Sequence, residues 1–171
     1  MAQPLTRPAH SVPPHSLPSE MTVLGALLQE PELLPACRRV LAPDDFYHHA
    51  HRLIYASAVR VAETGESPTW MAMTHDLRRR GELEEIGGND YLCALIDAVP
   101  TTAVFPFHLR SVARKAQARR IAELALSLHA LAMADDGWQD ALKDMMEVAP
   151  LVLLAATSVP THRRRIVTAT A

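Results

Sequence analysis

The chain has 171 residues, a length typical of one domain, and 49% of them are apolar, which is enough for a hydrophobic core. Its formal net charge of −2 excludes a strong overall attraction to nucleic acids or membrane surfaces, so any such attraction has to come from a local patch. The apolar residues are mostly Ala, Leu, Val, Met and Ile, and only six glycines occur, so the composition favours helices.

Both ends of the chain are expected to be tails. Residues 1–16 carry several prolines among small polar residues, which predicts an extended, disordered segment. Residues 157–171 contain the run Arg163–Arg165 and predict a basic tail. The sequence shows neither a secretory signal pattern nor an apolar run long enough for a membrane helix. We therefore expect a cytoplasmic protein without a membrane partner, with Cys37 and Cys93 as small core residues.

Residues 17–104 predict a compact bundle of short helices. Ser19 is expected to cap the first helix, which buries Leu24 and Leu27 at helical spacing. Pro31 suits the first turn of the helix that follows, because proline is tolerated where a helix has no backbone donor to satisfy.

A longer helix comes next. Asp44 or Asp45 offers a cap before Phe46, and the apolar spacing continues to about Glu63. Gly65 is expected to end this helix.

Two shorter helices complete the bundle. Thr69 is expected to cap the first of them, which stops at Gly81. Residues 83–88 predict a turn-rich connection, and Asn89 or Asp90 is expected to cap the second helix.

Residues 105–156 predict a helical hairpin. One long helix runs from about Pro106 to about Ala134, a turn follows at 135–137, and a returning helix spans 138–149. A hairpin this small buries its apolar face either against the bundle or against a second copy. The second half of the long helix has the alternating spacing of a coiled coil, and the first half is out of phase with it. The candidate self-association seam is Ile121, Leu124, Leu128, Leu131, Leu142 and Met145.

The chemistry of common enzymes is missing from the sequence. No G-x-x-x-x-G-K-[ST] phosphate loop occurs in the 171 residues, so ATP hydrolysis by that route is not expected of this chain alone. His48 and His51 could share a helix face near Asp44, Asp45 and His49, which allows a metal interpretation. Caps and structural histidines are the competing interpretation, and we prefer it because no further ligands converge. We predict no catalytic residues, no cofactor and no metal.

A basic stretch is the most distinctive surface feature of the long helix. Its members are Arg110, Arg114, Lys115, Arg119 and Arg120. They belong either to a solvated helix face or to a contact with an acidic partner or with phosphates. No aromatic residues interleave with them, so stacking on single-stranded bases is not supported.

Several short motifs occur in an order that resembles the N-terminal domain of the DnaB-like replicative DNA helicases. The strongest has the spacing D-F-Y-x-x-x-H-x-x-I-x-A from Asp45, and R-G-E-L, I-G-G, Y-L and V-P-T follow it between 80 and 101. The resemblance covers residues 17–149 and departs from the family at the Phe105-Pro106-Phe107 run and at Pro150. The family-like positions with an expected structural role are Phe46, Tyr47, His51, Gly87, Gly88 and Tyr91.

The resemblance implies an all-α fold, a compact bundle of short helices followed by a helical hairpin. It further implies that hairpins pair into a ring-shaped collar and that the domain binds primase, helicase subunits or a loading protein. The family's ATPase activity belongs to a RecA-like motor domain that these 171 residues do not contain, so we expect no enzyme activity from this chain alone.

Three functions follow from these patterns. The leading hypothesis is a replication-associated interaction module, as an accessory protein, a decoy or a truncated helicase product. A nucleic-acid-binding regulator that uses the basic stretch and the basic tail is the alternative. A metalloenzyme is the third, and it depends on the histidine cluster alone.

Overall fold

The structure, a computed structural model, describes residues 12–133 together with Gln139, Lys143 and Met146. Every regular element in these residues is helical and no strand occurs among them, which confirms the all-α prediction. The chain divides into two compact units, Met1–Ala122 and Glu123–Ala171.

The helices follow one another with short connections. In chain order they are α1 (Leu17–Gln29), η1 (Pro31–Leu33), α2 (Leu34–Arg38), η2 (Pro43–Asp45), α3 (His49–Glu63), α4 (Trp70–Arg80), α5 (Gly88–Asp97), η3 (Thr102–Val104) and α6 (Phe105–Ala132). Helix α6 begins in the first unit and continues into the second.

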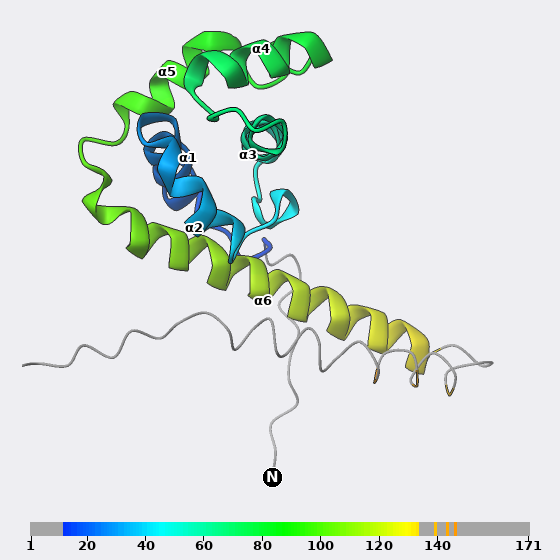
Figure 1. Cartoon of the computed structure of the whole chain (residues 1–171). Helices are drawn as coiled ribbons and strands as arrows, with labels where there is room; N and C mark the ends of the chain where they lie inside the picture. Colours follow the sequence, from blue (N-terminus) through cyan, green and yellow to red (C-terminus); the bar gives the residue numbers. More distant parts are fainter. Residues whose placement is uncertain (1–11, 134–138, 140–142, 144–145, 147–171) are drawn as a thin grey trace, which may run out of the picture. The chain divides into compact units, whose positions relative to one another are not determined.

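Helix α1 is the centre of the first unit. It packs against α5 and α3, and α3 packs in turn against α4, as Figure 1 shows. The apolar faces of these helices form one core, with Leu24, Leu27, Ile54, Leu77 and Leu92 fully buried. Each face follows the three- and four-residue spacing that the sequence shows.

The contact between α1 and α5 is close because Gly25 has no side chain. A Cβ atom at this position would overlap the carbonyl oxygen of Leu95 and would lie 2.7 Å from the Cγ2 atom of Val99. The same junction is bonded at the end of α5, where Gln29 Nε2 donates to the carbonyls of Ile96 and Val99 at 2.9 Å each. The Ile96 carbonyl also accepts the backbone N–H of Val99 at 3.1 Å, so Gln29 adds a second donor where α5 ends.

The ends of α4 match their prediction. Thr69 is the N-cap, and its hydroxyl accepts the backbone N–H of Ala72 at 3.4 Å. Gly81 ends the helix in the left-handed region at φ +74°, where a Cβ would be strained. Residues 83–87 form the expected turns before α5.

Three other predicted caps are wrong. Helix α1 begins at Leu17, and Ser19 lies buried inside its first turn, because Pro18 already fits the start of a helix. Neither Asp44 nor Asp45 caps α3, which begins at His49.

The cap predicted for α5 is the third. Asn89 and Asp90 lie within its first turn, and the N-cap is Gly87 at φ +98°. Glycine adopts this left-handed conformation readily, and no side chain accepts a hydrogen bond at this cap.

The first half of α6 docks on the bundle. Phe105, Val112, Ala113 and Ala116 are buried, each at 4% exposure or less. This docking face explains why the first half of the helix is out of phase with the apolar spacing of the second half. The predicted turn at 135–137, most of the returning helix and the basic tail lie outside the described residues.

Two smaller expectations differ from the structure. The stretch expected to be disordered ends earlier than residue 16, because the Pro14 carbonyl accepts a hydrogen bond from Arg119 and the His15 ring stacks on Tyr47 at 4.2 Å. Cys37 is buried as expected, whereas Cys93 lies on the exposed side of α5. Among the described residues no single helix is long and apolar enough to cross a membrane. Helices α5 and α6 together have the length and composition for a span, but the chain bends by 81° between them.

Candidate functional site

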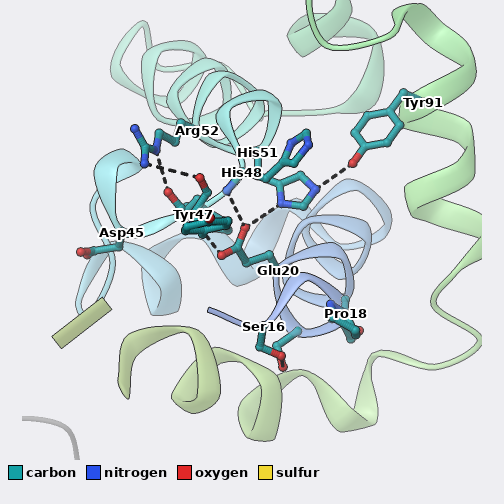
Figure 2. A network of polar contacts seen from close by, with 12 residues as sticks. Ser16, Pro18, Glu20, Asp45, Tyr47, His48, His51, Arg52 and Tyr91 are labelled. Carbon is teal, nitrogen blue, oxygen red and sulfur yellow. Dashed lines mark hydrogen bonds and ion pairs between the residues drawn. The ribbon is translucent and has the colours of Figure 1, made fainter. Parts of the chain in front are cut away.

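A carboxylate lies at the centre of the first unit. Glu20 is 1% exposed, and its carboxylate accepts the backbone N–H groups of Tyr47 at 2.8 Å and His48 at 3.3 Å. The Nδ1 atom of His51 lies 2.8 Å from Oε2 of this carboxylate, the oxygen that also accepts the N–H of His48. Figure 2 shows the three contacts converging on Glu20 from the link before α3 and from the first turn of α3.

The network continues through the histidine to α5. An ionised carboxylate only accepts hydrogen bonds, so Nδ1 of His51 carries a proton. In the neutral ring Nε2 is then an acceptor, and the Tyr91 hydroxyl donates to it at 2.8 Å (Figure 2). We name Glu20, His51 and Tyr91 the buried polar network; it ties α1, α3 and α5 together.

The hydrogen bonds of the network keep Glu20 ionised. Burial raises the pKa of this carboxyl group, but the hydrogen bond from His51 and the two backbone N–H donors together outweigh burial, so the pKa lies below its ordinary value of 4.5. Burial and the nearby Glu20 charge raise the pKa of Tyr91, so its hydroxyl stays protonated at neutral pH. Each polar side-chain atom of Glu20, His51 and Tyr91 thus has a hydrogen-bond partner within the chain.

The family-like residues of the sequence lie in or beside this network. Phe46 is fully buried, and Tyr47 contributes its backbone N–H. Gly87 lies close to Tyr91, because a Cβ atom added at Gly87 would be 3.2 Å from the Cβ of Tyr91. Gly88 has φ +71° with open space around it. Sequence reasoning did not identify Glu20, although its place one turn before Leu24 on the buried side of α1 was a usable signal.

A second polar cluster joins α3 to α4. Asp76 is buried at 5% exposure, and its Oδ2 atom accepts from Arg60 at 2.7 Å and 2.9 Å and from the Ser57 hydroxyl at 2.9 Å. Arg60 also donates to Glu82 at 2.8 Å. Burial raises the pKa of Asp76, and the bonds from Arg60 and Ser57 outweigh it and lower the pKa below 3.8.

A hollow of about 440 Å³ lies beside this cluster, between the end of α3 and α4. Its lining mixes both signs of charge, with Arg79 and Arg80 from α4 and Glu63 and Glu66 from the end of α3 and the residues after it. Within the part of the chain that the structure describes, no three acidic, histidine or cysteine side chains come close enough to hold a metal ion.

The structure separates the five basic residues of α6 into two groups. Arg119 is 8% exposed and donates to the Pro14 carbonyl at 2.7 Å and to the Asp45 carbonyl, and its guanidinium lies 5.9 Å from the centre of the Tyr47 ring. Arg120 pairs with the Asp45 carboxylate. These two arginines hold α6 against the link before α3.

The other three basic residues face outward. Arg110, Arg114 and Lys115 are exposed, and none of them makes an ion pair with another described residue. The nucleic-acid alternative therefore loses two of the five cations on which it depends, and the basic tail lies outside the described residues.

The predicted self-association seam is uncovered where the structure describes it. Ile121 is 53% exposed and Leu128 is 38% exposed, while Leu124 is half-buried. Leu126 on the same helix and Met133, just after the helix ends, are also exposed, at 49% and 74%. The structure does not describe the other three seam positions, which are the side chain of Leu131 and the residues Leu142 and Met145.

Comparison with known proteins gives one consistent family. The family model described as DnaB-like helicase N terminal domain matches residues 12–114. The replicative DNA helicase DnaB of Geobacillus stearothermophilus is 39% identical over 127 residues, which cover 74% of this chain and 27% of that helicase. This chain thus spans well under a third of that relative.

Solved structures give the same answer for the fold. The crystal structure of the N-terminal domain of DnaB helicase from Mycobacterium tuberculosis has a TM-score of 0.67 and 30% identity, covering 85% of this chain and 98% of that domain. A DnaB-like replicative helicase, described together with its interactions with primase, has a TM-score of 0.64 and 26% identity, covering 84% of this chain and 35% of that protein.

Proposed function

This chain belongs to the family of DnaB-like helicase N-terminal domains, and from that premise we propose that it is an interaction and oligomerisation module of DNA replication. Its partners are primase, replicative helicase subunits, a loading protein or a second copy of itself. The observation that carries the proposal is the uncovered apolar side of α6, where Ile121 is 53% exposed on a helix whose opposite side is docked.

Self-association is supported by the apolar area that α6 leaves in water. Ile121, Leu126 and Leu128 are all more than a third exposed, and burial of such side chains is favourable in proportion to the area covered. A soluble domain rarely leaves several large apolar side chains uncovered on one helix unless a partner covers them.

Primase binding is supported by one of the similar structures. The DnaB-like replicative helicase at 26% identity is described with its interactions with primase, and 84% of this chain aligns with it. We carry primase binding over to this chain as part of the proposal, together with binding of helicase subunits.

The proposal gives this chain no unwinding activity alone. The 171 residues contain no phosphate loop of the G-x-x-x-x-G-K-[ST] type, and the buried polar network is saturated by its own hydrogen bonds. The expected ATPase rate of the purified chain is the background rate, with and without single-stranded DNA.

The test is an association measurement with the primase and the replicative helicase of the same organism. The chain, each partner and each mixture are analysed by size-exclusion chromatography with light scattering. The proposal expects a complex with at least one partner, or a mass above one protomer for the chain alone. A monomer that binds neither protein contradicts it.

A matched pair of variants locates the surface. Ile121→Lys places a charge on the uncovered side of α6 and is expected to weaken self-association or partner binding. Met71→Lys changes an apolar side chain that is 73% exposed on α4 and serves as the control. Equal loss of association in both variants contradicts the assignment to α6.

A further inference from the structure

The outward side of α6 within the first unit carries a pattern of its own. Phe107, Arg110, Arg114 and Ile121 are spaced by three, four and seven residues, so they line one side of the helix. The docked residues Val112 and Ala116 lie on the opposite side. We call these four residues the outer face of α6.

The outer face has apolar ends and a cationic middle. Phe107 is 59% exposed and Ile121 is 53% exposed, and they are separated by 14 residues, a rise of about 21 Å along the helix. Phe107 belongs to the Phe105-Pro106-Phe107 run at the start of the helix. Its neighbour Phe105 is buried at 4% exposure and fixes the start of the helix on the bundle.

The two arginines between these ends are exposed in the part of the chain that the structure describes. Neither Arg110 nor Arg114 makes an ion pair with a described residue, in contrast to Arg119 and Arg120 further along the helix. A guanidinium group has five N–H donors in a fixed fork that matches a carboxylate.

We propose that the outer face of α6 docks an amphipathic acidic helix of another protein. Apolar side chains of that helix cover Phe107 and Ile121, and carboxylates between them pair with Arg110 and Arg114. This inference rests on the proposed function, because it specifies the chemistry of a partner for the same module. Three to four turns of partner helix span the distance between the two apolar ends.

A protein helix fits this surface better than a nucleic acid strand does. A single strand is held by a run of cations with aromatic side chains on which successive bases stack. The outer face offers two cations and one aromatic ring, and it ends in an aliphatic side chain. An apolar anchor beside complementary charge is instead the common pattern of a helix laid along a protein surface.

The test uses a fluorescein-labelled synthetic helix of 20 residues with leucines at both ends of one side and glutamates between them. Fluorescence anisotropy measures its binding to the whole chain, with a peptide of scrambled order as the comparison. We expect binding of the ordered peptide only. Arg110→Glu combined with Arg114→Glu is expected to weaken binding at least tenfold, because two attractive pairs become repulsive, and Phe107→Ser is expected to weaken it as well.

Matched variants make the result specific. Arg78→Glu changes an exposed arginine of α4, and Met71→Ser changes an exposed apolar residue of the same helix. Both are expected to leave peptide binding unchanged. A peptide with lysines in place of the glutamates is expected to bind the double glutamate variant better than the unchanged chain. Circular dichroism and urea unfolding confirm that each variant is folded.

Several results overturn the inference. Equal binding of the ordered and scrambled peptides does so, and so does equal binding to the unchanged chain and the double glutamate variant. Loss of oligothymidine binding on the double substitution, without an effect on the peptide, assigns the arginines to nucleic acid. A change in sedimented mass without peptide binding assigns them to a second copy.

The same samples separate this inference from the proposed function. If primase or helicase binds the double glutamate variant as well as the unchanged chain, the outer face is not its docking site, while the module function stands. If neither protein binds the unchanged chain and the chain is a monomer, the proposed function fails whatever the peptide does.

Discussion

The buried polar network and the outer face of α6 differ in whether their charged side chains have partners within the described chain. Glu20 and His51 are each 1% exposed, and each of their hydrogen-bonding atoms has a partner within the chain. On the outer face Arg110 and Arg114 have no ion-pair partner among the described residues, and Phe107 is 59% exposed. We expect the first region to stabilise the fold, and we propose that the second binds a partner. Substitutions in the two regions should therefore have separable effects.

The largest effect on stability is expected for Glu20→Ala. The change leaves the backbone N–H groups of Tyr47 and His48 and the ring of His51 without an acceptor in a buried site. Loss of one member of such a buried charged set costs about 3–5 kcal/mol. Urea unfolding followed by circular dichroism measures the loss. A difference below about 1 kcal/mol would show that water replaces the carboxylate and that the network is not a stabilising element.

The next largest effect is expected for Gly25→Ala. The added methyl group overlaps the carbonyl oxygen of Leu95, which is backbone and cannot rotate away, so α1 and α5 must separate. Overpacking of this kind costs about 1–3 kcal/mol. The same urea titration gives the value. An unchanged midpoint would mean that the two helices are not held as closely as described.

Part of the fold could be predicted because its signals are local. Thr69 and Gly81 flank the apolar spacing of α4, and nothing nearby competes with either signal. The caps predicted at Ser19 and at Asn89 failed because Pro18 and Gly87, one or two residues earlier, fix the start of the helix by themselves. Local propensity cannot rank such neighbouring signals.

The polar network could not be predicted from spacing. His51 lies 31 residues after Glu20, and Tyr91 lies 40 residues after His51, so no single helix face brings the three together. The sequence also could not predict that Arg119 is buried while Arg110 is exposed, because the bundle determines which side of α6 is docked. The resemblance to the family identified several of these positions, but it did not identify their partners.

A fall in pH is expected to lower the free energy of unfolding of the bundle by less than the Glu20→Ala substitution does. The pKa values of Glu20 and Asp76 are lower in the folded chain than their ordinary values of 4.5 and 3.8, so the unfolded chain binds protons first as the pH falls. Both carboxylates therefore contribute stability above about pH 4.5, and this stability is lost as the pH falls through the lower folded pKa values. The effect is smaller than that of Glu20→Ala because a protonated carboxyl group still fills its site.

Urea titrations between pH 7 and pH 3 measure this dependence. Glu20→Gln and Asp76→Asn remove one titrating group each, so the fall in unfolding free energy should be shallower in each variant than in the unchanged chain. A stability that rises as the pH falls below 4.5 would contradict the assignment of both carboxylates.

The smallest effect on stability is expected on the outer face. Arg114→Glu changes an exposed side chain without an ion-pair partner among the described residues, so the free energy of unfolding should change by no more than about 0.5 kcal/mol. The same titration checks this value. A loss of more than about 2 kcal/mol would mean that Arg114 makes stabilising contacts within the fold. The outer face of α6 would then not differ from the buried polar network in its effect on stability.

We propose that α6 is a surface for association, beside a bundle whose polar network is hydrogen-bonded within the chain. Sedimentation velocity of the unchanged chain and of Ile121→Lys, each alone and with primase, tests this most directly. For the unchanged chain we predict a mass above the 18.8 kDa protomer or a complex with primase. For Ile121→Lys we predict that this association is lost, while the variant unfolds at the same urea concentration as the unchanged chain. If the chain stays an 18.8 kDa monomer in every sample and sediments separately from primase in the mixtures, this proposal is contradicted.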